Sequence, residues 1–153
     1  MVIEALLPHA GAMVLLDSVL AWDERGIRCA ARSHLDLNNP LRAHGRLAAL
    51  CGAEYALQAA ALHGALRAGG TAQAAGYLAR LRDLVLRVER LDDPALGTLG
   101  IEARLERAEG AGMSYELSVT CQAGSLLLSA AATIAVPGLA QVHGAGRGWG
   151  TQA

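Results

Sequence analysis

The sequence predicts an α+β protein in which one long helix packs against an antiparallel sheet. One stretch, residues 47–66, carries apolar residues at helical spacing, and shorter stretches on both sides of it alternate apolar with polar residues. Helical spacing indicates a helix with a buried stripe, whereas alternation with period two indicates strands. Because the strands lie before and after the helix rather than alternating with further helices, an α+β layout is expected.

Two strands are predicted before the helix. Residues 13–23, MVLLDSVLAWD, begin with a short apolar run that favours a strand, and residues 23–26, DERG, are typical of a turn. Residues 27–33, IRCAARS, alternate and predict a second strand that pairs with the first as a hairpin. Residues 34–45 predict a loop, because Pro40 disfavours helical backbone at Asn39.

The helix is predicted from its apolar stripe and from the signal that ends it. Two glycines, Gly69 and Gly70, follow the last periodic residue, as is common after a helix C-terminus. The stripe consists of Leu47, Leu50, Cys51, Leu57, Ala61 and Ala65. Its richness in alanine predicts a helix enclosed by the sheet with little room for side chains.

Four further strands are expected after Gly76, arranged as a meander. They cover residues 77–91, 99–105, 115–121 and 125–136, and turn signals separate them. We expect a single domain over residues 1–142 and a loosely held, glycine-rich tail over residues 143–153. The length of 153 residues is enough for one domain with a sizeable core.

Composition excludes several classes of protein. The net charge is -1 and the arginines are interleaved with acidic residues, which argues against nucleic-acid binding. Cys29, Cys51 and Cys121 have neither metal-ligand nor redox-motif spacing, so no metal or cofactor is expected. With no export signal and no apolar run of about 18 residues, we expect a cytoplasmic protein that does not span a membrane.

Two short motifs carry a resemblance to a known family. Residues 7–9, Leu-Pro-His, lead into an apolar run and Asp17, which resembles the opening of the short-chain 3-hydroxyacyl-(acyl carrier protein) dehydratases. Residues 52–55, Gly-Ala-Glu-Tyr, together with Gln58 resemble the central helix of that family. The likeness covers about residues 6–136 and is strongest for the dehydratase-like proteins of aryl-polyene biosynthesis clusters.

The resemblance implies a hotdog fold, in which a curved antiparallel sheet wraps one long central helix. It also implies dimers joined edge to edge, with active sites at the interface between a His of one subunit and an acidic residue of the other. The family carries a His-Phe-Pro-Gly segment before the helix. Here His44 is followed by Gly45 and lies ten positions before Glu54, which is closer than the family spacing.

Dehydration of a 3-hydroxyacyl thioester requires a base, an acid and a donor to the thioester oxygen. A neutral His suits the base, a Glu in an apolar site can hold the proton for the leaving hydroxyl, and N–H groups of a helix's first turn can supply the donor. Glu54 is predicted as the catalytic acid because it lies on the apolar stripe, between Cys51 and Leu57. The alternative is a Glu that pairs with an Arg or lies at the edge of the stripe.

His44, in the loop before the helix, is the predicted base, with His34 as its rival. An exposed loop His without a catalytic role is the alternative. His9 matches the family opening and is interpreted as structural, while His63 and His143 suggest no chemistry.

Substrate binding is predicted for Gln58 and Arg46. Gln58 lies one helical turn after Glu54 and could orient its carboxyl group, or it could be a polar group satisfied at a dimer interface. Arg42 and Arg46 flank His44 and could receive the phosphate of a pantetheine arm or an acidic carrier protein, although a solvated loop is the alternative.

Three functions follow from these residues. The first is dehydration of 3-hydroxyacyl thioesters carried on acyl carrier protein or CoA, in fatty-acid-like or polyene biosynthesis. The second is a hotdog thioesterase in which Glu54 activates water and no His is required. The third is a catalytically degenerate partner of an active dehydratase. We expect a homodimer, or a heteromer with a related dehydratase.

Overall fold

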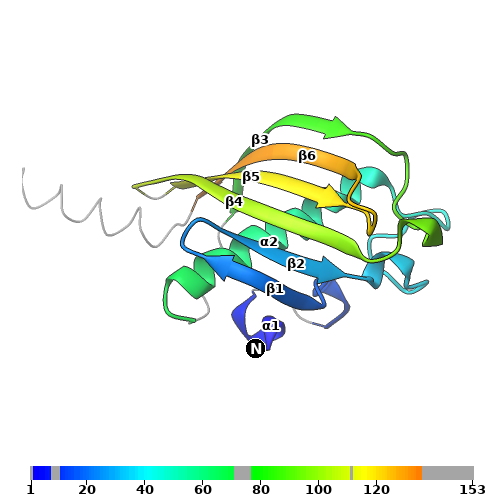
Figure 1. Cartoon of the computed structure of the whole chain (residues 1–153), viewed down its shortest axis with the longest axis horizontal. Coiled ribbons are helices and arrows are strands. Elements are labelled where there is room, and N and C mark those ends of the chain that lie inside the picture. Colours follow the sequence, from blue (N-terminus) through cyan, green and yellow to red (C-terminus); the bar gives the residue numbers. More distant parts are fainter. Residues whose placement is uncertain (1, 8–10, 71–76, 111, 136–153) are drawn as a thin grey trace, which may run out of the picture.

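A six-stranded antiparallel sheet curves around one long helix (Figure 1). The computed structural model describes residues 2–7, 11–70, 77–110 and 112–135. The strands are ordered β1-β2-β4-β5-β6-β3, so β1 and β3 form the two edges. The central helix, α2, lies against one face of this sheet, and the opposite face is free of helices in the described part of the chain (Figure 1).

The predicted hairpin is present but begins later than expected. Strand β1 spans Ser18–Asp23 and pairs with β2, Gly26–Ala31. Residues 13–17 were predicted to belong to the first strand and do not, because the apolar run is bound elsewhere. The backbone N–H of Leu15 donates to the side chain of Gln58 on α2, at 2.9 Å, so this run packs under the helix rather than in the sheet.

Short helices precede the hairpin and follow it. Helix α1 covers Ile3–Leu6, and two 3-10 turns cover Gly11–Met13 (η1) and Ser33–Leu35 (η2). Their short length leaves no periodic pattern to detect, and none of the three was predicted. Residues 8–10, which include His9, lie outside the described part of the chain.

The central helix ends as predicted but begins later than the predicted residue 47, because Ala48 is extended and pairs with Arg90. A 3-10 turn, η3 (Ala49–Cys51), runs into α2, which covers Gly52–Arg67. Gly69 and Gly70 adopt left-handed backbone conformations and donate to the carbonyls of Leu66 and Ala65, at 3.2 and 3.0 Å. This is the Schellman arrangement, which satisfies the last carbonyl groups of the helix.

The remaining strands form a meander only in part. Strands β4 (Leu99–Glu109), β5 (Gly112–Thr120) and β6 (Leu126–Ala135) pair in sequence order. Strand β3 (Tyr77–Leu86) instead pairs with β6, while β4 pairs with β2. The predicted four-strand meander is therefore wrong at β3, because residues 87–98, which contain the 3-10 turn Pro94–Leu96 (η4), carry the chain across the sheet.

The core lies between α2 and the inner face of the sheet. Side-chain burial alternates as predicted along β2 and β5 but not along β1, β3 and β6. Helix α2 contributes mainly alanines, such as Ala56, Ala59 and Ala60, which allow close contact. The helix and curved sheet form the hotdog arrangement, which confirms the predicted α+β class. No helix in the described residues is long and apolar enough to cross a membrane. The predicted glycine-rich tail lies outside those residues and stays a prediction.

Candidate active site

Glu54 lies on the one face of α2 that the sheet does not cover. Leu50, Leu57 and Ala61 share this face at helical spacing, and each is exposed or half-buried. Part of the predicted stripe therefore lies on the open side of the helix, whereas its members Leu47 and Ala65 are fully buried. We call residues 50, 54, 57 and 61 the open stripe.

The expectation that Glu54 is buried within its own chain is wrong. Its side chain is exposed, and it makes no hydrogen bond or ion pair among the described residues. The sheet covers the opposite side of the helix, where Tyr55 and Ala59 are fully buried. An apolar stripe indicates burial, but it does not tell whether the same chain or another chain covers it.

Gln58 is fully buried and holds the segment that precedes β1. Its Oε1 accepts the N–H of Leu15 at 2.9 Å, and its Nε2 donates to the carbonyl of Met13. Both ends of the amide are thus engaged with backbone on the inner side of the helix. The structure shows no contact between Gln58 and Glu54, although the two residues are one turn apart.

His44 lies at the tip of a tight hairpin, residues 43–46, which we call the His44 hairpin. Ala43 and Arg46 exchange two backbone hydrogen bonds of 2.8 and 3.0 Å. His44 and Gly45, with φ of 53° and 74°, form a two-residue turn of type I′. Few residues other than glycine adopt this backbone conformation, and histidine is among those enriched in it. The turn exposes the imidazole.

The two arginines that flank His44 have different surroundings. Arg46 is exposed, and its side chain makes no hydrogen bond among the described residues. Arg42 is largely buried and is fully used within the chain: Nε donates to the carbonyl of Asp36 at 2.8 Å, and Nη1 lies 3.5 Å from Asp92. Of the pair, Arg46 alone is free to meet a phosphate.

The rival histidine, His34, is fully buried, and neither ring nitrogen has a hydrogen-bond partner in the described part of the chain. Burial lowers the pKa of His34, so its neutral form is favoured. Its position inside η2 gives a substrate no access to the ring. His63 is also buried, but both its ring nitrogens are bonded.

Sequence reasoning missed a polar network that fixes the loop before the helix. Asn39 Nδ2 donates to the Tyr55 hydroxyl at 3.0 Å, and this hydroxyl lies 2.7 Å from Ser33 Oγ. Because Ser33 Oγ donates its own proton to the carbonyl of Leu15, at 2.8 Å, the Tyr55 hydroxyl must donate to Ser33. Every proton in this chain of bonds is assigned. In the sequence, the only indication of this network was that Tyr55 directly follows Glu54.

The expected oxyanion donors are largely engaged. The N–H groups of Cys51 and Gly52 donate within η3, and the N–H of Ala49 donates to the carbonyl of Glu89 at 3.0 Å. The helix start therefore offers fewer free donors than the sequence suggested. Among the described residues, no cluster of His, Cys, Asp and Glu could hold a metal ion.

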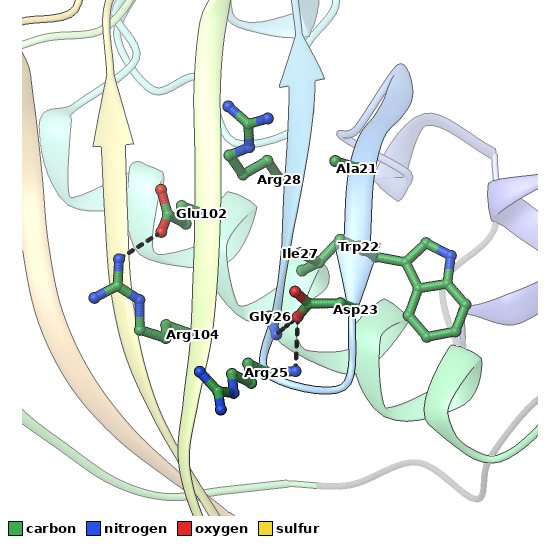
Figure 2. Close-up of a pocket in the computed structure, with 9 residues that line it drawn as sticks. All are labelled: Ala21, Trp22, Asp23, Arg25, Gly26, Ile27, Arg28, Glu102 and Arg104. Atoms are coloured by element: carbon green, nitrogen blue, oxygen red, sulfur yellow. Dashed lines mark hydrogen bonds and ion pairs between the residues drawn. The ribbon is translucent and has the colours of Figure 1, made fainter.

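A shallow groove of about 510 Å³ lies on the outer face of the sheet, away from these residues (Figure 2). It is lined by Arg25 in the turn before β2, by Arg28 on β2 and by Arg104 on β4 (Figure 2). Arg104 pairs with Glu102 at 3.1 Å, and Asp23 is bonded to backbone N–H groups of the turn. None of the candidate catalytic residues lines this groove.

The curved sheet around one long central helix defines the class of hotdog-fold proteins. Within this class, the chain belongs to the ApeP-like family, because the model of that family, described as ApeP dehydratase, matches residues 1–144. The predicted resemblance to dehydratase-like proteins of aryl-polyene clusters is thereby confirmed. No curated protein matches the chain.

Solved structures with similar folds include a dehydratase and thioesterases. The dehydratase heterocomplex ApeI:P from Xenorhabdus doucetiae has a TM-score of 0.75 and 20% identity, over 88% of this chain and 90% of that chain. The thioesterase SAV0944 from Staphylococcus aureus has a TM-score of 0.58 and 11% identity, over 77% and 90%. A hypothetical thioesterase with coenzyme A from Streptococcus pneumoniae has 0.55 and 14%, over 78% and 84%. At these identities the likeness shows a shared fold.

Proposed function

We propose that this protein acts in the dehydration of 3-hydroxyacyl thioesters carried on acyl carrier protein, in aryl-polyene or related fatty-acid-like biosynthesis. One observation supports this most strongly: in a chain of the dehydratase family, the only acidic residue on α2 stands exposed on its open stripe. A carboxyl group with no hydrogen-bond or ion-pair partner among the described residues is free to meet a substrate.

The proposed chemistry assigns one proton transfer to each of two residues. His44 removes the proton next to the thioester carbonyl, the bond between the β carbon and its hydroxyl breaks, and Glu54 protonates the hydroxyl so that water leaves. An enoyl thioester is the product. Arg46, exposed beside His44, is proposed to meet the phosphate of the pantetheine arm. Gln58 is proposed to support substrate binding indirectly, because it holds the segment at Met13 and Leu15 against α2.

A second subunit is proposed to cover the open stripe. Leu50 on this stripe is 51% exposed, and the edge strand β3 exposes Leu84, Val85 and Leu86. An edge strand with apolar side chains invites pairing with another chain. A partner seated there would place Glu54 among apolar side chains, where the acid of a dehydratase is expected. We propose either a homodimer or a heteromer with a related dehydratase, and the ApeI:P heterocomplex supports the heteromer.

Two other functions remain as competing proposals. A thioesterase would use Glu54 to activate water, and the thioesterase structures with the same fold support it. A subunit without turnover of its own would lend Glu54 or a supporting surface to an active partner. Among the described residues no hydrogen bond joins His44 to Glu54, and this supports the last function.

The test is a product assay with a 3-hydroxyacyl carrier-protein substrate. Enoyl product and free acid are measured for the purified chain alone and after addition of a related dehydratase that carries the complete His segment. Dehydration predicts enoyl product, from the chain alone or only from the mixture. Free acid without enoyl product would establish the thioesterase instead. Sedimentation of the chain alone and of the mixture shows which assembly is active, and a stable monomer in both would contradict the proposed subunit contact.

A further inference from the structure

One carboxylate, that of Asp92, holds both legs of the His44 hairpin. Asp92 lies in the segment after β3, and its side chain is 3% exposed. Its Oδ1 accepts the N–H of Leu47, the residue after the hairpin, at 3.1 Å. Its Oδ2 lies 3.5 Å from Nη1 of Arg42, the residue before the hairpin. The residues that flank the hairpin on both sides therefore converge on Asp92.

Arg90 keeps this carboxylate charged and in place. Its Nε donates to Asp92 Oδ1 at 2.9 Å, and its Nη2 donates to Oδ2. The hydrogen bonds from Arg90 hold the pKa of Asp92 well below its usual range. Asp92 is thus ionised at any pH near neutrality, and its oxygens only accept hydrogen bonds.

Both legs are tied further to the body of the protein. Arg42 also donates from Nη2 to the carbonyl of His34 at 3.3 Å, which fixes the entry leg to η2. The exit leg runs beside the segment after β3, where the N–H of Leu91 donates to the carbonyl of Leu47 at 2.8 Å. The backbone at the base of the hairpin is bonded, while the side chains of His44 at the tip and of Arg46 beside it have no hydrogen bond among the described residues.

We propose that Asp92 is a positioning residue for the reaction. By binding both Arg42 and Leu47, Asp92 sets the position and direction of the His44 hairpin. It thereby sets the position of the His44 imidazole relative to Glu54. A two-residue turn transmits any tilt of its base directly to its tip. The proposal rests on the proposed role of His44 as the base, and it assigns Asp92 no contact with substrate.

The test is a double-mutant cycle of Asp92→Asn with His44→Ala, assayed in the active assembly. Asparagine keeps the size and one oxygen of the side chain but loses the charge that Arg42 and Arg90 face. We expect Asp92→Asn to lower kcat by on the order of tenfold to a hundredfold with KM little changed, since small misplacement of a catalytic group has effects of that size. In the His44→Ala background it should cause no further loss, because Asp92 acts through His44.

Asp93→Asn is the matched control. Asp93 is the neighbouring carboxylate, is exposed and caps η4 through the N–H of Ala95, so its substitution should leave kcat unchanged. Arg42→Gln removes the entry leg alone and should lower kcat by less than Asp92→Asn. Wild-type kcat in a folded Asp92→Asn variant would overturn the proposal. An equal loss in the His44→Ala background would also overturn it, since Asp92 would then act on the fold as a whole.

Amide hydrogen exchange separates this proposal from the proposed function. Asp92→Asn should speed exchange at Ala43 and Arg46 relative to wild type, and Asp93→Asn should not, whether or not His44 is the base. If His44→Ala keeps full activity, the assignment of His44 fails, but faster exchange would still support the hold of Asp92 on the hairpin. If exchange at Ala43 and Arg46 is unchanged in Asp92→Asn, the proposal that Asp92 holds the hairpin is overturned, whatever the activity of the variant.

Discussion

Polar side chains at the two ends of α2 differ in whether their own chain satisfies their hydrogen bonds. Near its C-terminal end, His63 uses both ring nitrogens: Nδ1 lies 2.8 Å from the hydroxyl of Tyr115, and Nε2 lies 2.8 Å from the carbonyl of Asp23. Because a carbonyl only accepts, Nε2 carries the proton and Nδ1 accepts from Tyr115. Near the N-terminal end, Glu54 is exposed and unbonded among the described residues.

This difference separates stability from function along one helix. The bonds of His63 join α2 to β5 and to the β1–β2 turn, so they stabilise the fold and leave no capacity for chemistry. Toward the other end, the bonds of Tyr55 and Gln58 hold the segments at Ser33 and Leu15 on the buried side of the helix, and Glu54 is left free on the open side. A polar side chain on the helix is thus a candidate for catalysis only when its own chain does not satisfy it.

The largest expected effect is the loss of activity in Glu54→Gln. The amide cannot donate a proton to the leaving hydroxyl, so we expect turnover to fall by on the order of a hundredfold or more. The melting temperature should change little, because Glu54 is exposed and makes no hydrogen bond or ion pair among the described residues. Glu24→Gln is the control and should keep full activity, because Glu24 lies in the β1–β2 turn and pairs with Arg67 at the other end of α2, at 3.2 Å. A folded Glu54→Gln variant with most of its turnover would exclude Glu54 as the acid.

The next effect concerns stability, at the opposite end of the helix. His63→Leu leaves the Tyr115 hydroxyl and the Asp23 carbonyl without their partner in a buried place, which should cost about 2–4 kcal/mol of unfolding free energy. Urea unfolding measures this difference. His44→Asn, at the exposed hairpin tip, should cost less than about 0.5 kcal/mol, because asparagine also adopts left-handed backbone. Similar losses of unfolding free energy in the two variants would contradict the proposed difference between the bonded His63 and the exposed His44.

Sequence reasoning predicted the elements that depend on local pattern. The body of the helix, its glycine end and the alternation of β2 and β5 follow from spacing along the chain, and they match the structure. The edge position of β3 could not be predicted, because pairing with β6 joins segments far apart. The exposure of Glu54 was equally hidden, since it depends on which face of α2 the sheet covers. Contacts such as Gln58 with Leu15, which are 43 residues apart, leave no trace in local pattern.

The dependence of stability on pH provides a third test. Burial lowers the pKa of His63 and of His34 from 6.5, so unfolding takes up protons below that pH. Stability should be full above about pH 6.5 and fall below it by up to about 1.4 kcal/mol per pH unit for each histidine. In His63→Leu the acid slope should be roughly half as steep. An unchanged slope would show that His63 does not titrate on unfolding.

Stability should also fall on the alkaline side. Burial raises the pKa of the Cys29 thiol from 9.0 to about 12 and that of Tyr115 from 10.0 to about 12. The unfolded chain then releases protons that the folded chain keeps, so stability declines as the pH rises above about 9. Cys29→Ser should flatten the first part of this decline, and a curve without any decline above pH 9 would contradict the burial of both groups.

The smallest expected effect is that of Tyr55→Phe. It removes one hydroxyl that accepts from Asn39 and donates to Ser33, and the loss should be about 1 kcal/mol. Because the network holds the loop that leads to the His44 hairpin, kcat should fall more than stability alone explains. Thermal unfolding and turnover are measured on the same sample. A change in stability without any change in kcat would show that this network does not affect the position of the His44 hairpin.

The most direct measurement of the central claim is product formation by His44→Ala. With a 3-hydroxyacyl carrier-protein substrate and the active assembly, enoyl product should form more slowly by on the order of a hundredfold, since no other base stands at the tip of the hairpin. The fold should persist, because the side chain is exposed. Enoyl product at the wild-type rate would contradict the assignment of His44. Free acid at the wild-type rate, with no enoyl product from either protein, would contradict dehydration itself and leave hydrolysis by Glu54.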